Sequence, residues 1–120
     1  MTRRSEVQRV ADMIDAAERA VRHLGELDLP GLQADELRRD AIVRALEIVG
    51  EACKHVTQPV RDRFPSVSWQ PIAGMRDRLI HGYDQVDLAI VWETVTKFVP
   101  AVLPELRKVR DVLIAEEPTA

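Results

Sequence analysis

Apolar residues recur at the three- and four-residue spacing of amphipathic helices along most of the chain, and no segment alternates like a β-strand. The first run predicts a helix over residues 4–24, and the second predicts a helix over residues 35–56. Their apolar positions are Val7, Val10, Ala11, Ile14, Ala17, Val21 and Leu24, then Ile42, Ala45, Leu46, Ile48, Val49, Ala52, Cys53 and Val56. Between them, "GELDLPGLQ" at residues 25–33 contains glycine and proline, and it predicts a break.

The second half opens with another segment that contains prolines, "TQPVRDRFPSVSW" at residues 57–69, which also predicts a break. Ser68 is placed to cap a short helix whose first turn accepts Pro71. We expect Gly82 to end this helix as the residue after its C-cap. The apolar stripe of the helix is Ile72, Met75, Leu79 and Ile80.

A last helix is predicted over residues 88–113, with Asp87 as its cap. Pro100 and Pro104 fall opposite the apolar stripe, so the segment is predicted to be one kinked helix or two collinear ones. The end, residues 116–120, is expected to fray. Together these elements predict an all-α, four-helix bundle-like single domain over residues 1–120.

Composition narrows the class of protein. Hydrophobic residues make up 46% of the chain, which is enough for a core and too many for a disordered protein. No apolar run approaches the ~18 residues of a membrane span, and the first residues lack the apolar region of a secretory signal. The single cysteine, Cys53, is expected to be a buried free thiol in a cytoplasmic protein. A net charge of −3 favours local rather than extended contact with nucleic acid.

Several residues in the helices invite a structural explanation. Gly50 lies inside a predicted helix, where it is unfavourable, so a close backbone approach is expected there. Glu51 and His55 are four residues apart and predict a surface ion pair. We expect Trp69 and Trp92 to pack in the core or at an interface.

The segment "GMRDRLIHGYDQVD", residues 74–87, holds the candidate chemistry. On an ideal helix Arg76 falls within the apolar stripe, so it either snorkels, meets a buried carboxylate or faces an anion in a cleft. Asp77 and His81 are four residues apart, so the carboxylate can orient the imidazole. Arg76 and His81 diverge by about 140°, and they converge only if Gly82 unwinds the last turn or a second subunit completes the site.

The chain resembles the HepT-like family of HEPN-domain proteins, which are toxins of prokaryotic toxin–antitoxin pairs. The resemblance covers nearly the whole chain, through "DAIVRALEIVGEACKHV", "FPSVSWQPIAGMRDRLIHGYDQVD" and "VWETVTKFVPAVLPEL" in this order. Its core motif is an arginine, four residues, a histidine, any residue and a tyrosine, which here are Arg76, His81 and Tyr83. The family often has asparagine after the arginine, whereas this chain has Asp77.

The resemblance implies a metal-independent endoribonuclease with a HEPN-type fold that acts as a homodimer and needs no cofactor. It implies an antitoxin partner with a minimal nucleotidyltransferase (MNT) domain, which transfers adenylyl groups to the tyrosine, here Tyr83. Arg76 and His81 would then be catalytic and Asp77 supporting. RNA cleavage through the 2′-hydroxyl needs a base, an acid and a cation, and two motifs facing each other supply two histidines.

Two alternatives remain open at the level of sequence. Glu47 and Glu51 are compatible with a metal-dependent nucleotide pyrophosphatase, although that fold needs further inward carboxylates and no metal-ligand spacing is present. The stronger alternative is a non-catalytic, dimeric helical binding module of the same fold, which the acidic pI of about 5.6 favours. Incubation of the purified dimer with RNA in EDTA separates an enzyme from a binding module.

Overall fold

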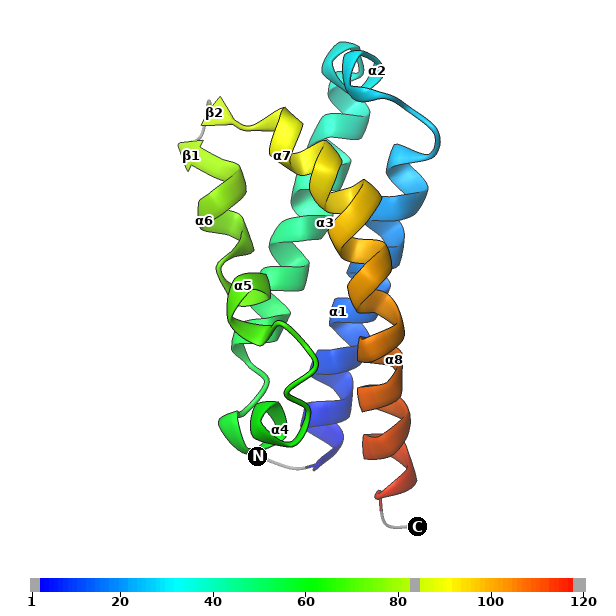
Figure 1. The fold of residues 1–120 in the computed structure, drawn as a ribbon, viewed down its shortest axis with the longest axis vertical. Helices are drawn as coiled ribbons and strands as arrows, with labels where there is room; N and C mark the ends of the chain where they lie inside the picture. The colour runs from blue at the N-terminus through cyan, green and yellow to red at the C-terminus, as the bar shows by residue number, and fades with distance from the viewer. Residues whose placement is uncertain (1–2, 83–84, 118–120) are drawn as a thin grey trace.

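The computed structural model describes residues 3–82 and 85–117, and these form an elongated helical body of 49 × 26 × 23 Å. Three long helices run along its length: α1 (Arg3–Leu24), α3 (Glu36–Lys54) and α8 (Val99–Ala115). Figure 1 shows α1 beside both α3 and α8, and these are the helices against which it packs. The all-α prediction and the bounds of the first two predicted helices are confirmed, within a residue or two at each end.

Two short helices occupy segments that were predicted to be breaks. The first, α2 (Leu29–Ala34), starts at Asp28, whose carboxylate accepts a hydrogen bond from the Gly31 amide at 2.8 Å. Pro30 stands in its first turn and Leu32 is fully buried, so the segment carries the cap and the apolar anchor of a helix start. The prediction of a break at residues 25–33 is therefore wrong for its second half.

The second short helix is α4 (Gln58–Arg63), within the predicted break at residues 57–69. The Arg61 guanidinium donates to the carbonyl oxygens of Cys53 at 2.7 Å and Val56 at 3.1 Å. These carbonyls lie at and just beyond the end of α3, where an α-helix leaves acceptors without intrahelical partners. Arg61 therefore closes the end of α3 and holds α4 against it, a tertiary contact that periodicity cannot reveal.

Between α4 and the last helical segment runs a series of short elements that we call the motif arm, residues 69–82 and 85–86. The motif arm consists of α5 (Trp69–Ala73), α6 (Met75–Leu79), β1 (Ile80–Gly82) and β2 (Gln85–Val86). Figure 1 shows the motif arm lying along α3, with the hairpin at the end of the molecule where α2 lies.

The helix predicted up to Gly82 is wrong in its second half. It breaks at Gly74, ends at Leu79, and continues as an antiparallel hairpin in which Ile80 pairs with Val86. The Leu79 carbonyl accepts from the Asp87 amide at 2.9 Å, so the returning chain takes the place of another helical turn. Ser68 does stand at the N-cap of α5, but its side chain makes no capping hydrogen bond.

The last helical segment is continuous and contains a wide turn. It runs through α7 (Leu88–Glu93), the π-helical turn η1 (Thr94–Phe98) and then α8. In η1 the Val99 amide donates to the carbonyl of Thr94. Pro100 lacks an N–H and its ring would collide with the carbonyl four residues earlier, and a wider turn relieves that collision. Of the two predicted forms, one helix or two collinear ones, the structure shows one continuous helical segment, and Pro100 and Pro104 lie on its exposed face as predicted.

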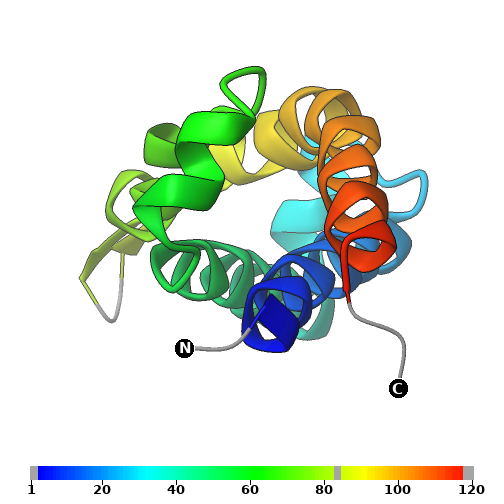
Figure 2. The ribbon, with the colours of Figure 1, turned by 90° about the horizontal axis from the view of Figure 1, so that it is seen from below.

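The core lies between α1, α3, the motif arm and the α7–α8 segment, which Figure 2 shows arranged around the long axis. Both tryptophans pack against this core, as expected, and each donates its indole N–H to a loop carbonyl. Trp69 bonds Phe64 at 3.0 Å and Trp92 bonds Leu27 at 2.9 Å. Across residues 3–82 and 85–117, no helix combines the length and apolar character that crossing a membrane demands.

Candidate active site

The motif arm packs closely against α3 at Gly50, a buried residue near the C-terminal end of α3. A Cβ atom at this position would lie 3.2 Å from the carbonyl oxygen of Ile72 and 3.7 Å from that of Ala73. The expected close backbone approach is confirmed, because an added Cβ atom would fit under α5 only if the neighbouring backbone moved by a few tenths of an ångström. This contact sets the distance between α3 and the motif arm and so positions the motif residues that follow.

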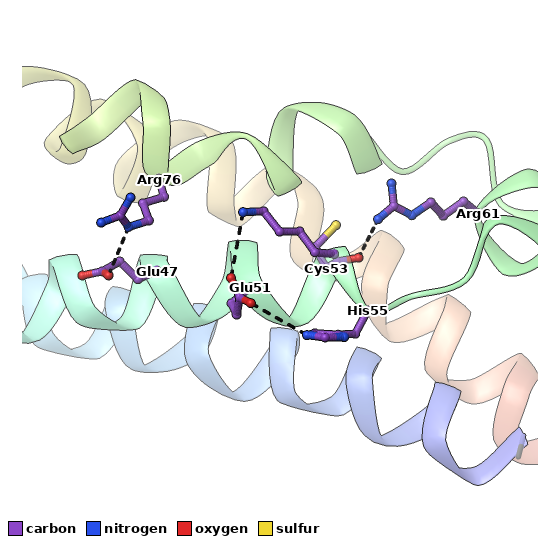
Figure 3. Close-up of polar contacts among 7 residues, drawn as sticks. Glu47, Glu51, Cys53, His55, Arg61 and Arg76 are labelled. Atoms are coloured by element: carbon purple, nitrogen blue, oxygen red, sulfur yellow. Dashed lines mark hydrogen bonds and ion pairs between the residues drawn. The ribbon is translucent and has the colours of Figure 1, made fainter. Parts of the chain in front are cut away.

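Arg76 lies one helical turn beyond that contact, above the face of α3 that carries Glu47. Its Nε atom is 3.5 Å from the Glu47 carboxylate, and the two side chains are 55% and 29% exposed (Figure 3). The expectation that Arg76 lies within the apolar stripe is wrong, because the break at Gly74 changes the direction of α6. The sequence left open whether Arg76 snorkels, meets a buried carboxylate or faces an anion in a cleft. In the structure it meets a partly buried carboxylate at the edge of a cavity.

That cavity has a volume of about 520 Å³ and lies between α3 on one side and α6, the hairpin and the start of α7 on the other. Its lining combines two cations, two carboxylates and four aliphatic side chains. These residues are Arg39, Asp40, Val43, Glu47, Arg76, Ile80, Val86 and Leu88. A cavity of this size fits a ligand of nucleotide dimensions.

His81 does not share this cavity. It is exposed on β1, and it is absent from the residues that line the space beside Arg76. Asp77 is also exposed, and no hydrogen bond or ion pair joins it to His81 among the described residues. The prediction that Asp77 and His81 share one helical face is wrong, since α6 ends at Leu79 and His81 lies on β1. Tyr83 lies outside the described residues.

The remaining polar residues of α3 form ordinary surface contacts. The Glu51 carboxylate is 3.8 Å from His55 and 3.9 Å from Lys54, so the predicted surface pair is confirmed (Figure 3). Within residues 3–82 and 85–117, no three His, Cys, Asp or Glu side chains gather in a way that suits a metal ion. Glu47 is paired with Arg76, and Glu51 is paired with Lys54.

Cys53 is a buried free thiol, as predicted. Its Sγ atom donates to the Trp69 carbonyl at 3.3 Å, and burial raises the pKa of the thiol to about 11. Because the thiolate is the nucleophilic form, this side chain is inert near neutral pH. Cys53 therefore helps to pack α3 against α5 and takes no part in the candidate site.

Sequence reasoning missed the contribution of Arg39 and Asp40 to the cavity. Arg39, Val43 and Glu47 follow one another at four-residue intervals, so they share one face of α3. This spacing can be seen in the sequence, but it indicates a cavity lining only once the motif arm is known to cover that face of α3.

The comparisons with known proteins agree on one family. The profile described as "Ribonuclease HepT-like" matches residues 13–109. A probable ribonuclease HepT of Thermococcus cleftensis is 32% identical over 90% of this chain and 98% of its own length. A putative RNase of Methanocaldococcus jannaschii is 32% identical over 79% of this chain and 87% of its own.

A putative RNase of Caldanaerobacter subterraneus is 41% identical over 62% of this chain and 67% of its own length. No solved structure matches the chain. The profile match includes all of α3, the whole motif arm and the first part of α8. The chain belongs to the Ribonuclease HepT-like family.

Proposed function

We propose that this protein is a metal-independent endoribonuclease in which Arg76 and His81 carry the reaction. Relatives named as ribonucleases support ribonuclease activity. The observation that carries the proposal for the site is the position of Arg76, a half-exposed guanidinium on the wall of a nucleotide-sized cavity. An ion pair at this exposure contributes only ~0–1 kcal/mol, so an RNA phosphate can take the place of the Glu47 carboxylate.

The proposed chemistry needs no group beyond histidine and arginine. A base removes the proton of the 2′-hydroxyl, the 2′-oxygen bonds to phosphorus, and the bond from phosphorus to the 5′-oxygen breaks. An acid protonates the departing 5′-oxygen, which leaves a 2′,3′-cyclic phosphate and a 5′-hydroxyl. Imidazole titrates in the range needed for base or acid, and the Arg76 guanidinium stabilises the charge that develops on the phosphate oxygens.

A homodimer supplies the two imidazoles. One chain offers a single motif histidine, and His81 projects from β1 outside the cavity that Arg76 lines. Two such hairpins related by a two-fold axis would bring His81 of one subunit to the Arg76 of the other. Light scattering at micromolar concentration should give the mass of a dimer, and a monomer that still cleaves RNA would contradict this arrangement.

The biological role proposed for this activity is that of a toxin held in check by an MNT-domain nucleotidyltransferase antitoxin. Tyr83, two residues beyond His81, is the proposed acceptor of adenylyl groups. Each added nucleotide would bring a phosphate able to occupy Arg76 and bulk able to fill the adjoining cavity. The toxin is expected to be inactive when Tyr83 is adenylylated and active when it is unmodified.

Cleavage of RNA in EDTA by purified variants tests the enzymatic proposal. His81→Ala and Arg76→Ala should each lose ~10²–10⁴-fold in rate and keep the helical circular dichroism of the wild type. His55→Ala and Arg78→Ala are matched controls, because both residues are exposed and neither lines the Arg76 cavity. Unchanged cleavage by His81→Ala would contradict the proposed role. RNA binding without any cleavage would favour the non-catalytic binding module.

The control of the toxin is tested by co-expression with the nucleotidyltransferase. Intact-mass measurement of the purified toxin should then show an increase by whole adenylyl groups, and Tyr83→Phe should show none. If Tyr83→Phe is silenced as well as the wild type, inhibition comes from binding rather than from modification.

A further inference from the structure

We infer that the cavity beside Arg76 holds the nucleobase next to the scissile phosphate, and that Asp40 makes it select guanine over uracil. The inference rests on the proposed ribonuclease activity, whose phosphate site it extends along α3. The cavity has a volume of about 520 Å³, which lies within the range of small-ligand sites and accommodates one nucleotide.

The aliphatic lining of the cavity suits a flat ring. Val43 stands on α3, whereas Ile80 and Val86 are paired residues of the hairpin opposite, and Leu88 begins α7. All four side chains are partly buried and therefore keep surface available to a ligand. A base inserted between α3 and the hairpin would bury apolar surface on both of its faces, a contact that any base can make. The aliphatic side chains therefore explain why a base binds in the cavity, but not why one base is preferred over another.

The two arginines of the cavity stand at its opposite ends. Arg39 and Glu47 are eight residues apart on α3, which corresponds to roughly 12 Å of helix, and Arg76 pairs with Glu47. The Arg39 guanidinium donates to the Gln33 carbonyl, which fixes its position and leaves most of its five donors free for another acceptor. Phosphates on either side of the bound nucleoside therefore each meet a guanidinium group.

Asp40 supplies the selective group. It lines the cavity, is exposed, and has no hydrogen bond or ion pair within residues 3–82 and 85–117. Carboxylates accept hydrogen bonds from the amino groups of bases. Guanine presents adjacent N1–H and N2–H donors that match the two oxygens of a carboxylate. Uracil presents one N–H flanked by two carbonyl oxygens, which the carboxylate repels, so guanine is favoured.

Binding of short single-stranded oligodeoxynucleotides tests the pocket separately from cleavage, because these ligands lack the 2′-hydroxyl nucleophile. Four tetranucleotides that differ at one position in guanine, adenine, cytosine or uracil are titrated against the wild-type protein. Guanine should bind on the order of ten- to a hundred-fold more tightly than uracil. Asp40→Asn should remove most of that preference, and Asp111→Asn should keep it, since Asp111 is an exposed residue of α8 far from the cavity lining.

Mapping of cut sites on a mixed-sequence RNA completes the test. The wild type should cut next to guanine, and Asp40→Asn should cut with a reduced preference for guanine. Equal binding of the four tetranucleotides, or an unchanged preference in Asp40→Asn, would overturn the inference even where His81-dependent cleavage stands. The guanine preference in binding, without cleavage of any RNA, would instead overturn the ribonuclease proposal and leave the pocket in place.

Discussion

The bundle of α1, α3 and α8 and the motif arm are built on different principles. In the bundle, helices of 17–22 residues bury continuous apolar stripes against one another. In the motif arm, helices of five residues are followed by strands of three and two residues, and each depends on its neighbours for its position. The long helices therefore supply most of the continuous packing, whereas the motif arm adds buried anchors such as Ile72 and Leu79 to the core and carries the motif residues on its exposed side.

The largest effect on stability is expected within the bundle. Leu46→Ala removes a fully buried side chain from α3 and should lower the free energy of unfolding by ~2–5 kcal/mol, since it leaves a cavity in the core. Leu37→Ala, on the same helix but 81% exposed, is the matched control and should change it by less than about 0.5 kcal/mol. Urea denaturation measures both, and equal losses would contradict the assignment of the core.

Gly50→Val tests the contact that joins the two regions. The added side chain would meet the Ile72 carbonyl, so the motif arm must move away from α3 at a cost of ~1–3 kcal/mol. RNA cleavage should fall by more than the loss of stability explains, because Arg76 moves with the arm. Gly50→Ala should cost less, since a better helix former offsets part of the strain. A Gly50→Val protein as stable and active as the wild type would contradict the close approach.

Asp87→Ala tests the junction between the hairpin and α7. The Asp87 carboxylate accepts from the Ile90 amide at 3.1 Å, and loss of such a cap costs ~0.5–2 kcal/mol. Ser68→Ala provides the comparison, because Ser68 occupies the N-cap of α5 without a capping hydrogen bond and its loss should be close to neutral. Thermal unfolding of the two variants measures the difference in stability. If Ser68→Ala lost as much stability as Asp87→Ala, the capping role of Asp87 would be contradicted.

The smallest effect at neutral pH concerns Cys53, which packs α3 against α5. Burial raises its pKa from 9.0 to about 11, so between these values the unfolded chain loses the thiol proton and the folded chain keeps it. Stability should therefore be fully present below about pH 9 and should decline as the pH rises towards 11. Cys53→Ala should lack this part of the alkaline decline. Identical pH profiles of the two proteins, from urea denaturation at pH 8–11, would show that the thiol is not buried.

The bundle could be predicted from the sequence because its pattern repeats over many turns. Residues 4–24 and 35–56 each contain several turns of helical apolar spacing. A pattern of this length predicts a helix even where a single residue, such as Gly50, is unfavourable. The sequence predicts a break in place of α2, because glycine and proline interrupt the apolar pattern there. Asp28, Pro30 and Leu32 nevertheless carry the cap, the first turn and the apolar anchor of this helix. The helix α4 depends on Arg61 contacts with the end of α3, which no local pattern encodes.

The motif arm could be predicted only in part. The family resemblance and the chemistry of the side chains indicate Arg76 and His81, but the helix predicted to carry both residues ends at Leu79. His81 lies on a strand because the chain folds back as a hairpin. In this hairpin Leu79 accepts a hydrogen bond from Asp87 and Ile80 pairs with Val86, contacts that no local sequence pattern predicts. For the same reason Arg39 and Asp40 were not recognised, since the cavity exists only where the arm covers α3.

The central claim is that the motif arm cleaves RNA through the 2′-hydroxyl without a metal. The most direct test compares two oligonucleotides in EDTA, one entirely of ribose and one with a single 2′-deoxynucleotide at the mapped cut position, with product ends identified by mass spectrometry. The all-ribose strand should yield a 2′,3′-cyclic phosphate and a 5′-hydroxyl, and the deoxy position should not be cut. Cleavage at the deoxy position, or products with a 5′-phosphate, would contradict the account.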